Sequence, residues 1–208
     1  MPRVTAKSMA EMMSLPGHAQ VGLLVGQKYP KKAPSSFQVP YYAPAVKAFR
    51  DVYRKGEAKD VVAQALASAE AQGNVHRRRN LERAIKAFAQ SKSAQRKLFS
   101  VAVPRLEAAL GAVGIKASPD LQAVDEKGNQ VVIYYHCGTL AFDVEAAKRL
   151  LEIAHWIYAQ NDQELAPRQF EMLDLSSGTL HQIKKVRPST IKDMKTTAKL
   201  IESVWENL

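Results

Sequence analysis

Residues 131–136, with the sequence VVIYYH, constrain the fold of this chain more than any other segment. β-branched and aromatic residues follow one another there, without alternation between apolar and polar positions. A strand with one face in water alternates, whereas an unbroken apolar run is typical of a strand buried on both faces. The run therefore predicts a strand inside a central sheet on which helices pack.

Other strands are expected on both sides of this run. Alternating or apolar segments next to turn residues predict strands at 99–103, continued by 106–110, at 115–124, and as a hairpin at 170–175 and 179–183. Turn-forming residues at 125–129 separate the second of these strands from VVIYYH. The later half therefore reads strand, strand, strand, helix, strand, strand, helix, which indicates a mixed sheet.

Apolar residues at helical spacing predict helices at 46–53, 62–69, 81–88, 143–158 and 191–205. Asn74 and Asp143 are placed to cap the helices that follow them, and Gly73 lies where a helix should stop. Thr190 with Asp193 resembles a capping pair for the last helix. These local signals set most of the expected helix boundaries.

The first 44 residues carry weaker signals. Residues 1–19 read as a loosely ordered tail or a short helix, and residues 20–26 as a strand. Residues 28–44 contain four prolines and read as an irregular segment. Four hydrophobic residues are expected to anchor that segment: Phe37, Val39, Tyr41 and Tyr42.

The expected fold class is α/β (α+β), with a central mixed β-sheet flanked by helices and a helical N-terminal part. At 208 residues and 46% hydrophobic residues, the chain is long enough to build one core. Residues 1–96 are expected to be mainly helical and to pack on an α/β core of residues 97–208. The two parts together are expected to make one compact domain.

Charge is the unusual feature of the composition. Thirty Lys and Arg residues against twenty Asp and Glu residues give a net charge of +10. This balance fits a polyanionic partner such as nucleic acid, because phosphate contacts release counterions, but an ordinary solvated surface explains it equally well. Two basic groups are candidate nucleic-acid contacts: Arg77, Arg78, Arg79 and Arg83 on one helix, and Lys184, Lys185 and Arg187 near another.

Location and simple chemistry are bounded by what the sequence contains. A single cysteine, Cys137, excludes an internal disulfide and a Cys-rich zinc site, and reads as a small buried apolar residue. The apolar run at 21–25 is too short to span a bilayer, so a cytoplasmic location without a membrane partner is expected. Neither a glycine-rich phosphate loop nor a nucleophile elbow is found.

One stretch carries a family resemblance. Pro119-Asp120 is followed by turn residues at 125–129 and by the strand ending at His136. This arrangement resembles the RecB-like branch of the PD-(D/E)XK nucleases, in which a Pro-Asp or Ile-Asp motif, a hairpin and a strand with an acid, a spacer and a lysine follow in order. The resemblance implies a restriction-endonuclease-like core in residues 97–208.

The family's chemistry needs two carboxylates for a divalent metal and a lysine beside the attacking water. In this chain Tyr134 takes the place of the acid and His136 that of the lysine. Asp120 is the retained motif residue and a candidate catalytic residue and metal ligand. Glu107 is a candidate second ligand, and His136 a candidate base or ligand. The simpler interpretations are a turn-forming Asp120, a surface Glu107 and a hydrogen-bonded strand His136.

Three hypotheses remain open. The leading one is a catalytically degenerate nuclease-fold protein that binds nucleic acid or a nucleic-acid-processing complex, with no cofactor expected. The second is an active nuclease that uses Mg²⁺ or Mn²⁺ in an unusual site. The third is a phage- or defence-related interaction protein that binds a protein partner and no nucleic acid. The sequence indicates no particular oligomeric state.

Overall fold

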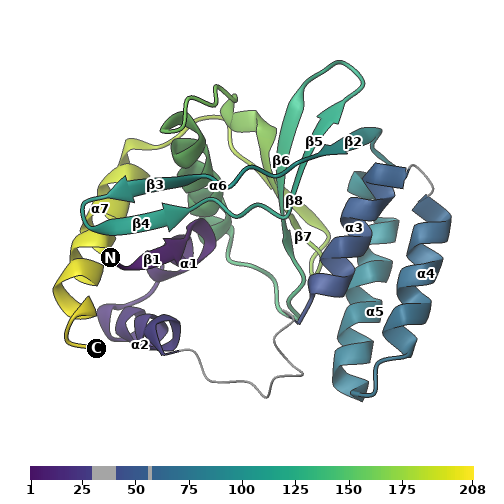
Figure 1. Cartoon of the computed structure of the whole chain (residues 1–208), viewed down its shortest axis with the longest axis horizontal. Helices are drawn as coiled ribbons and strands as arrows, with labels where there is room; N and C mark the ends of the chain where they lie inside the picture. Colours follow the sequence, from purple (N-terminus) through teal and green to yellow (C-terminus); the bar gives the residue numbers. More distant parts are fainter. Residues whose placement is uncertain (30–40, 56–57) are drawn as a thin grey trace.

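A computed structural model describes residues 1–29, 41–55 and 58–208, and these form an α+β fold with two mixed sheets (Figure 1). The larger sheet has five strands in the order β2-β5-β6-β7-β8. Their bounds are Leu98–Val101, Leu121–Asp125, Gln130–His136, Phe170–Asp174 and Thr179–Gln182. β6 pairs in parallel with β7, and the other neighbours are antiparallel. The expected mixed sheet flanked by helices is confirmed.

β6 lies at the centre of this sheet and is buried on both faces. Val132 and Tyr134 belong to one apolar cluster, whereas Val131, Ile133 and Tyr135 belong to another. Only the end residues of the strand are partly exposed. The prediction drawn from VVIYYH is therefore confirmed, and the two clusters are the cores between the sheet and its two helical layers.

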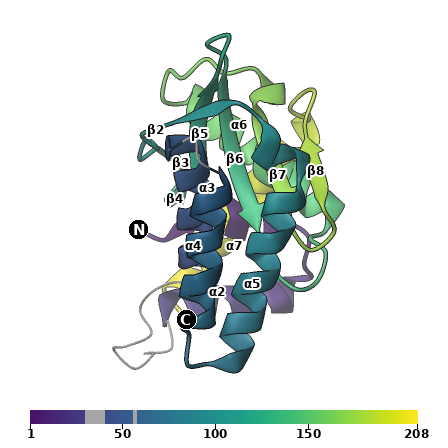
Figure 2. The same cartoon turned by 90° about the vertical axis from the view of Figure 1, so that its right-hand side faces the viewer.

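Different helices cover the two faces. α6 (Val144–Ala159), with α1 (Ala6–Met12), packs on the Tyr134 side, and α2 (Gly17–Lys28) and α7 (Pro188–Trp205) extend that layer. On the Tyr135 side lie α3 (Ala43–Lys55) and α5 (Val75–Gln90), with α4 (Ala58–Glu70) packed on both. Figure 2 shows these three helices side by side in front of the sheet.

Stacked aromatic rings join the second layer to β6. The rings of Phe49 on α3 and Phe88 on α5 stack with centroids 4.2 Å apart. Tyr135 meets Phe49 edge-on at 5.0 Å and Phe88 edge-on at 5.8 Å. Such contacts add to the free energy gained by burial, so this trio anchors α3 and α5 on the sheet.

The smaller sheet joins the start of the chain to its middle. β1 (Arg3–Thr5) pairs in parallel with β4 (Val113–Lys116), which pairs antiparallel with β3 (Glu107–Leu110). Along the chain, β3 and β4 thus lie between β2 and β5, which are neighbours in the larger sheet. The expectation that 106–110 continues the 99–103 strand was wrong, as was a single strand at 115–124. That second segment is broken at Ser118, whose φ of 47° leaves the extended region, and at Pro119.

Other expectations were wrong near the chain start and at the last helix. Residues 20–26, expected to form a strand, lie in helix α2, which begins after Pro16 and buries Leu24. Tertiary packing thus overrides the preference of a short apolar run that is interrupted by glycine. Thr190 and Asp193 do not cap α7, because that helix begins at Pro188, a residue suited to the first helical position. The expected anchors Phe37 and Val39 lie outside the described residues.

The two other predicted caps are confirmed. The Asn74 side chain accepts a hydrogen bond from the Arg77 amide at 2.9 Å at the start of α5. The Asp143 carboxylate accepts one from the Ala146 amide at 2.7 Å at the start of α6. The β7–β8 hairpin is also confirmed, with Gly178 at a φ of 71° in its turn.

No helix in the described ranges is long and apolar enough to cross a membrane.

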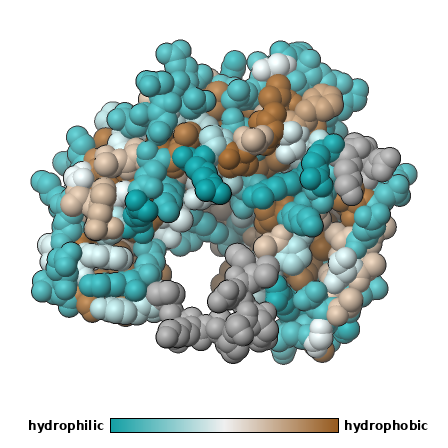
Figure 3. All heavy atoms as spheres, viewed as in Figure 1, coloured by the Kyte–Doolittle hydropathy of each residue, from teal (hydrophilic) through white to brown (hydrophobic). Residues whose placement is uncertain are grey.

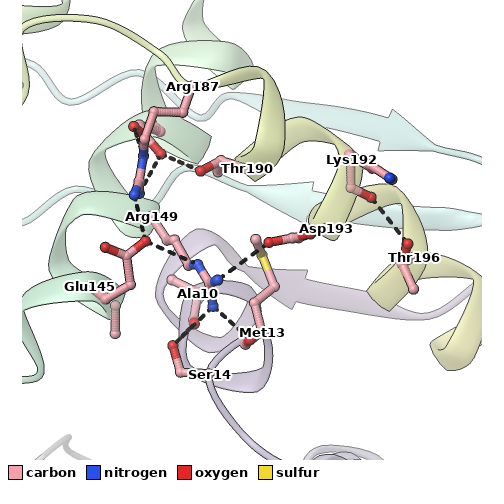
Figure 4. Close-up of polar contacts among 12 residues, drawn as sticks. Ala10, Met13, Ser14, Glu145, Arg149, Arg187, Thr190, Lys192, Asp193 and Thr196 are labelled. Carbon is pink, nitrogen blue, oxygen red and sulfur yellow. Dashed lines mark hydrogen bonds and ion pairs between the residues drawn. The ribbon is translucent and has the colours of Figure 1, made fainter.

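An ion-pair network ties α6, α7 and α1 together (Figure 4). The Arg187 guanidinium donates to Glu152 at 2.7 Å and to Glu145 at 2.6 Å, and the hydrogen bonds to Glu152 contribute most to holding the Arg187 pKa above its ordinary value. Arg149 reaches Asp193 on α7 at 3.3 Å and the Met13 carbonyl at 2.6 Å. Arg187, expected to contact nucleic acid, is thus engaged within the protein.

Replacing Arg187 with methionine tests this structural role. The Glu152 residue is 1% exposed, so its carboxylate would remain buried without its cationic partner. We expect unfolding in urea to show a loss of about 3 kcal/mol. The exposed neighbour Lys185 is the control, and Lys185→Met should change stability by no more than about 0.5 kcal/mol. Equal effects of the two substitutions would contradict a structural role for Arg187.

Candidate functional site

A cleft of about 1030 Å³ opens at the C-terminal end of β6, between the start of α1 and α3. Figure 3 shows this face hollowed between the two groups of helices, with hydrophilic side chains along the wall above the hollow. Among the residues that the structure describes, the charged ones that line the cleft are Lys7, Lys47, Arg50 and Asp120. Tyr41 and Tyr42, the last residues of β6 (134–136), and Cys137 and Gly138 just after it also line the cleft. Among the described residues, three cations therefore share the cleft with one carboxylate.

Asp120 is held by the main chain of β6. It immediately precedes β5, and its amide donates to the Ile133 carbonyl at 3.0 Å. The Tyr135 amide donates to its carboxylate at 2.8 Å, and the Arg50 guanidinium donates to its carbonyl oxygen. These contacts place Asp120 beside the end of β6, at the open end of the β5–β6 hairpin.

The electrostatic balance at Asp120 has two opposing parts. Burial raises the pKa of this carboxyl above its ordinary value, and the Tyr135 hydrogen bond with the charges of Lys7 and Arg50 offsets part of that rise. A carboxylate with a raised pKa destabilises the folded state once it is ionised. A carboxyl whose pKa is perturbed by burial and by nearby charges, and which lines a cleft, is a candidate functional group.

Tyr134 takes the place that the resemblance assigns to an acid, and it is buried. The residue is 4% exposed and packs in the cluster under α6, and its hydroxyl donates to the Ala117 carbonyl at 2.7 Å. Burial raises its pKa well above the ordinary value, so the hydroxyl stays neutral. A neutral phenol that already donates its proton to the main chain is a poor ligand for Mg²⁺, which prefers charged oxygen.

His136, the residue in the place of the lysine, lines the cleft at the end of β6. Its Nε2 lies 2.9 Å from the Leu140 carbonyl, and its ring lies 5.0 Å from that of Phe142. Its buried Nδ1 has no hydrogen-bond partner among the residues that the structure describes. The contact to Leu140 fits a strand histidine that orders the loop after β6.

Glu107 is not brought to Asp120. It lies on β3 in the smaller sheet, where it forms an ion pair with Arg3 at 3.4 Å, and it does not line the cleft. Within residues 1–29, 41–55 and 58–208, no three His, Cys, Asp or Glu side chains are grouped to hold a metal ion. The donor set around Asp120 therefore does not fit the two-carboxylate Mg²⁺ or Mn²⁺ site of the family.

The basic cluster of α5 divides between two surfaces. Arg83 donates to the carbonyls of Cys137 and Gly138 at 2.6 and 2.7 Å, and Arg77 lies over the Tyr41 ring at 5.6 Å. Arg78 pairs with Glu82 at 3.8 Å, and Arg79 is exposed. Only Arg77 and Arg83 thus contact the wall of the cleft.

The other expected basic group lies apart from the cleft. Lys184 and Lys185 are exposed between β8 and α7, and neither lines the cleft.

Cys137 lines the cleft, but burial raises the pKa of its thiol to about 12, so the thiol stays protonated near neutral pH. The cysteine behaves as the small buried residue that was expected.

Lys7, Lys47 and Arg50 were not identified from the sequence. Lys47 and Arg50 lie on the polar side of a helix that was predicted, and their three-residue spacing places them on one face. Lys7 comes from an N-terminal stretch with no motif. Their convergence depends on tertiary packing, and no local pattern signals it.

Comparison with models of known protein families gave no match, and comparison with curated proteins gave none either.

Replacing Asp120 with asparagine tests the electrostatic balance. The pKa of Asp120 is raised in the folded protein, so folding favours the protonated carboxyl. This contribution to stability is fully present below the ordinary carboxyl pKa and is lost as pH rises through the raised folded-state pKa. We therefore expect Asp120→Asn to raise the thermal midpoint at pH 7 and to lose this advantage near pH 3. Thermal unfolding followed by circular dichroism at both pH values measures the difference.

Asp125 provides a control of opposite sign. Hydrogen bonds from the Asn129 side chain and amide lower its pKa, so its ionised form stabilises the turn and this contribution is lost as pH falls. Asp125→Asn should lower the midpoint at pH 7. If both variants shift the midpoint in the same direction, the ionisation of Asp120 is not what governs its effect.

Proposed function

We propose that this protein is a catalytically degenerate member of the RecB-like branch of the PD-(D/E)XK fold and binds nucleic acid in the cleft around Asp120. The order of elements supports the family assignment. Pro119-Asp120 leads into the β5–β6 hairpin, Asp120 lies beside the end of β6, and α6 packs on the sheet directly afterwards. A restriction-endonuclease-like core is part of the same proposal.

The chemistry of the cleft favours binding over hydrolysis. Among the described lining residues, Asp120 is the sole carboxylate, and the acid's place holds the buried Tyr134. A metal-assisted attack on phosphate needs ligands that hold the ion beside the scissile bond. Asp120 faces cations instead, so the arrangement suits recognition of a polyanion.

The observation that carries the proposal is the meeting of Lys7, Lys47 and Arg50 in one cleft. They come from α1 and α3, which lie on opposite sides of β6. Cations at the walls of a concave surface focus the potential and attract phosphate groups. The net charge of +10 adds a long-range attraction of the same sign.

Two lysines of the cleft give the sharpest test. We expect the double variant Lys7→Gln/Lys47→Gln to weaken nucleic-acid binding and to reduce the slope of log K against log salt concentration by roughly 1.4 to 1.8, because about two phosphate contacts are lost. Fluorescence anisotropy with labelled oligonucleotides over a salt series measures both quantities. Lys7 and Lys47 are chosen over Arg50 because Arg50 also holds the Asp120 carbonyl.

The matched control removes the same charge elsewhere. Lys192 and Lys195 are exposed on α7 and do not line the cleft, so Lys192→Gln/Lys195→Gln should leave the slope nearly unchanged. If both double variants reduce binding equally, attraction is a property of overall charge and the cleft is not the site. If the unmodified protein shows no salt-dependent binding, the interaction-protein hypothesis takes its place.

Cleavage assays separate the binding function from the alternative of an active nuclease. With Mn²⁺ or Mg²⁺ and single- or double-stranded substrates, we expect no cleavage above that of buffer, because one carboxylate and a buried tyrosine do not hold the metal in position. Gel electrophoresis of labelled substrates reads out the result. Metal-dependent cleavage that disappears in Asp120→Ala would establish the active nuclease instead.

A further inference from the structure

Tyr41 is an exposed aromatic residue whose ring is held in place. The residue is 41% exposed and lines the cleft just before α3. The Asn80 side-chain amide donates to its hydroxyl at 3.0 Å, and the Arg77 guanidinium lies 5.6 Å from its ring centre. Tyr42 packs edge-on against it, with ring centroids 4.8 Å apart. Three neighbours thus orient a ring that burial alone does not fix.

The contacts around Tyr41 are not needed for the core. Tyr41 belongs to neither apolar cluster, and Asn80 and Arg77 lie on the outer part of α5. Here a side-chain amide and a guanidinium orient an exposed ring. Such pre-organisation is typical of a ligand-binding surface, because a ring that is already fixed loses little conformational entropy on binding. A neighbouring guanidinium also adds cation–π attraction.

Tyr41 shares the cleft with two cations of α3. Lys47 and Arg50 follow on α3, one turn apart, and line the same cleft. A flat aromatic surface next to a line of cations matches a chain that carries a base and a phosphate in each unit. In a duplex the faces of the bases are covered by their neighbours, whereas an unpaired base offers its face to an aromatic ring.

We propose that the cleft takes single-stranded nucleic acid, with one base stacked on Tyr41 and the adjoining phosphates along Lys47 and Arg50. This inference rests on the proposed function and adds the form of nucleic acid that the site selects. A cleft of about 1030 Å³ admits a short flexible segment of a single strand. A duplex contacts only the cations at the rim of the cleft and makes no stacking contact with Tyr41.

The experiment compares two probes and three variants by fluorescence anisotropy. The probes are a labelled oligothymidylate of about 12 nucleotides and a labelled duplex of the same length. We expect the unmodified protein to favour the single strand, and Tyr41→Leu to weaken single-strand affinity roughly 5- to 100-fold with an unchanged salt slope. Tyr41→Phe keeps the ring and should retain affinity within about twofold.

Tyr29→Leu is the matched control. Tyr29 is an exposed tyrosine at the end of α2 that does not line the cleft, so its replacement should leave both affinities unchanged. Thermal unfolding of each variant confirms that the fold is retained.

The outcomes distinguish the two proposals. Tight duplex binding that depends on Lys7 and Lys47, with no effect of Tyr41→Leu, would overturn the single-strand inference and leave the proposed function standing. The same loss in Tyr41→Phe as in Tyr41→Leu would overturn the stacking role. Absence of binding to both probes would overturn the proposed function, and the inference with it.

Discussion

The burial of β6 on both faces is the constraint on which the rest of the structure depends. One set of its side chains, including Tyr134, needs the layer with α1 and α6, and the other, including Tyr135, needs the layer with α3 and α5. Neither layer covers the C-terminal end of the strand, and the cleft opens there between them. Its walls therefore come from segments that are distant in sequence but fixed by the same strand.

The end of β6 also organises the polar groups of the cleft. The Tyr135 amide holds the Asp120 carboxylate, and the carbonyls of Cys137 and Gly138 accept from Arg83 on α5. One strand end thus orients an acid on one side and attaches a helix on the other. Among the described residues that line the cleft, Asp120 is the sole carboxylate, and it lies in the same cleft as Lys7, Lys47 and Arg50.

Local signals predicted the larger elements and failed where distant segments meet. The VVIYYH run, the helical spacing and the caps at Asn74 and Asp143 depend on near neighbours, and each was confirmed. α2 was mistaken for a strand because the burial of Leu24, which favours the helix, involves residues far along the chain. For the same reason the smaller sheet was missed.

The candidate site was predictable only in part. Asp120 and His136 were found through a motif and do line the cleft, whereas Lys7, Lys47 and Arg50 lie in no motif. Charge alone could not tell Arg187, which is paired with buried Glu152, from a cation available to a ligand. Family membership stays a proposal, since it rests on the order of elements around Pro119-Asp120.

The pairing of β1 with β4 has a consequence for how the protein is made. Arg3 pairs with Gly114, so β1 is synthesised more than a hundred residues before its partner strand. Until then the apolar side of α1, with Met9 and Met12, has no core to cover it. The apolar side of α1 therefore stays uncovered until the middle of the chain has been synthesised, and Lys7 can reach the cleft only after that.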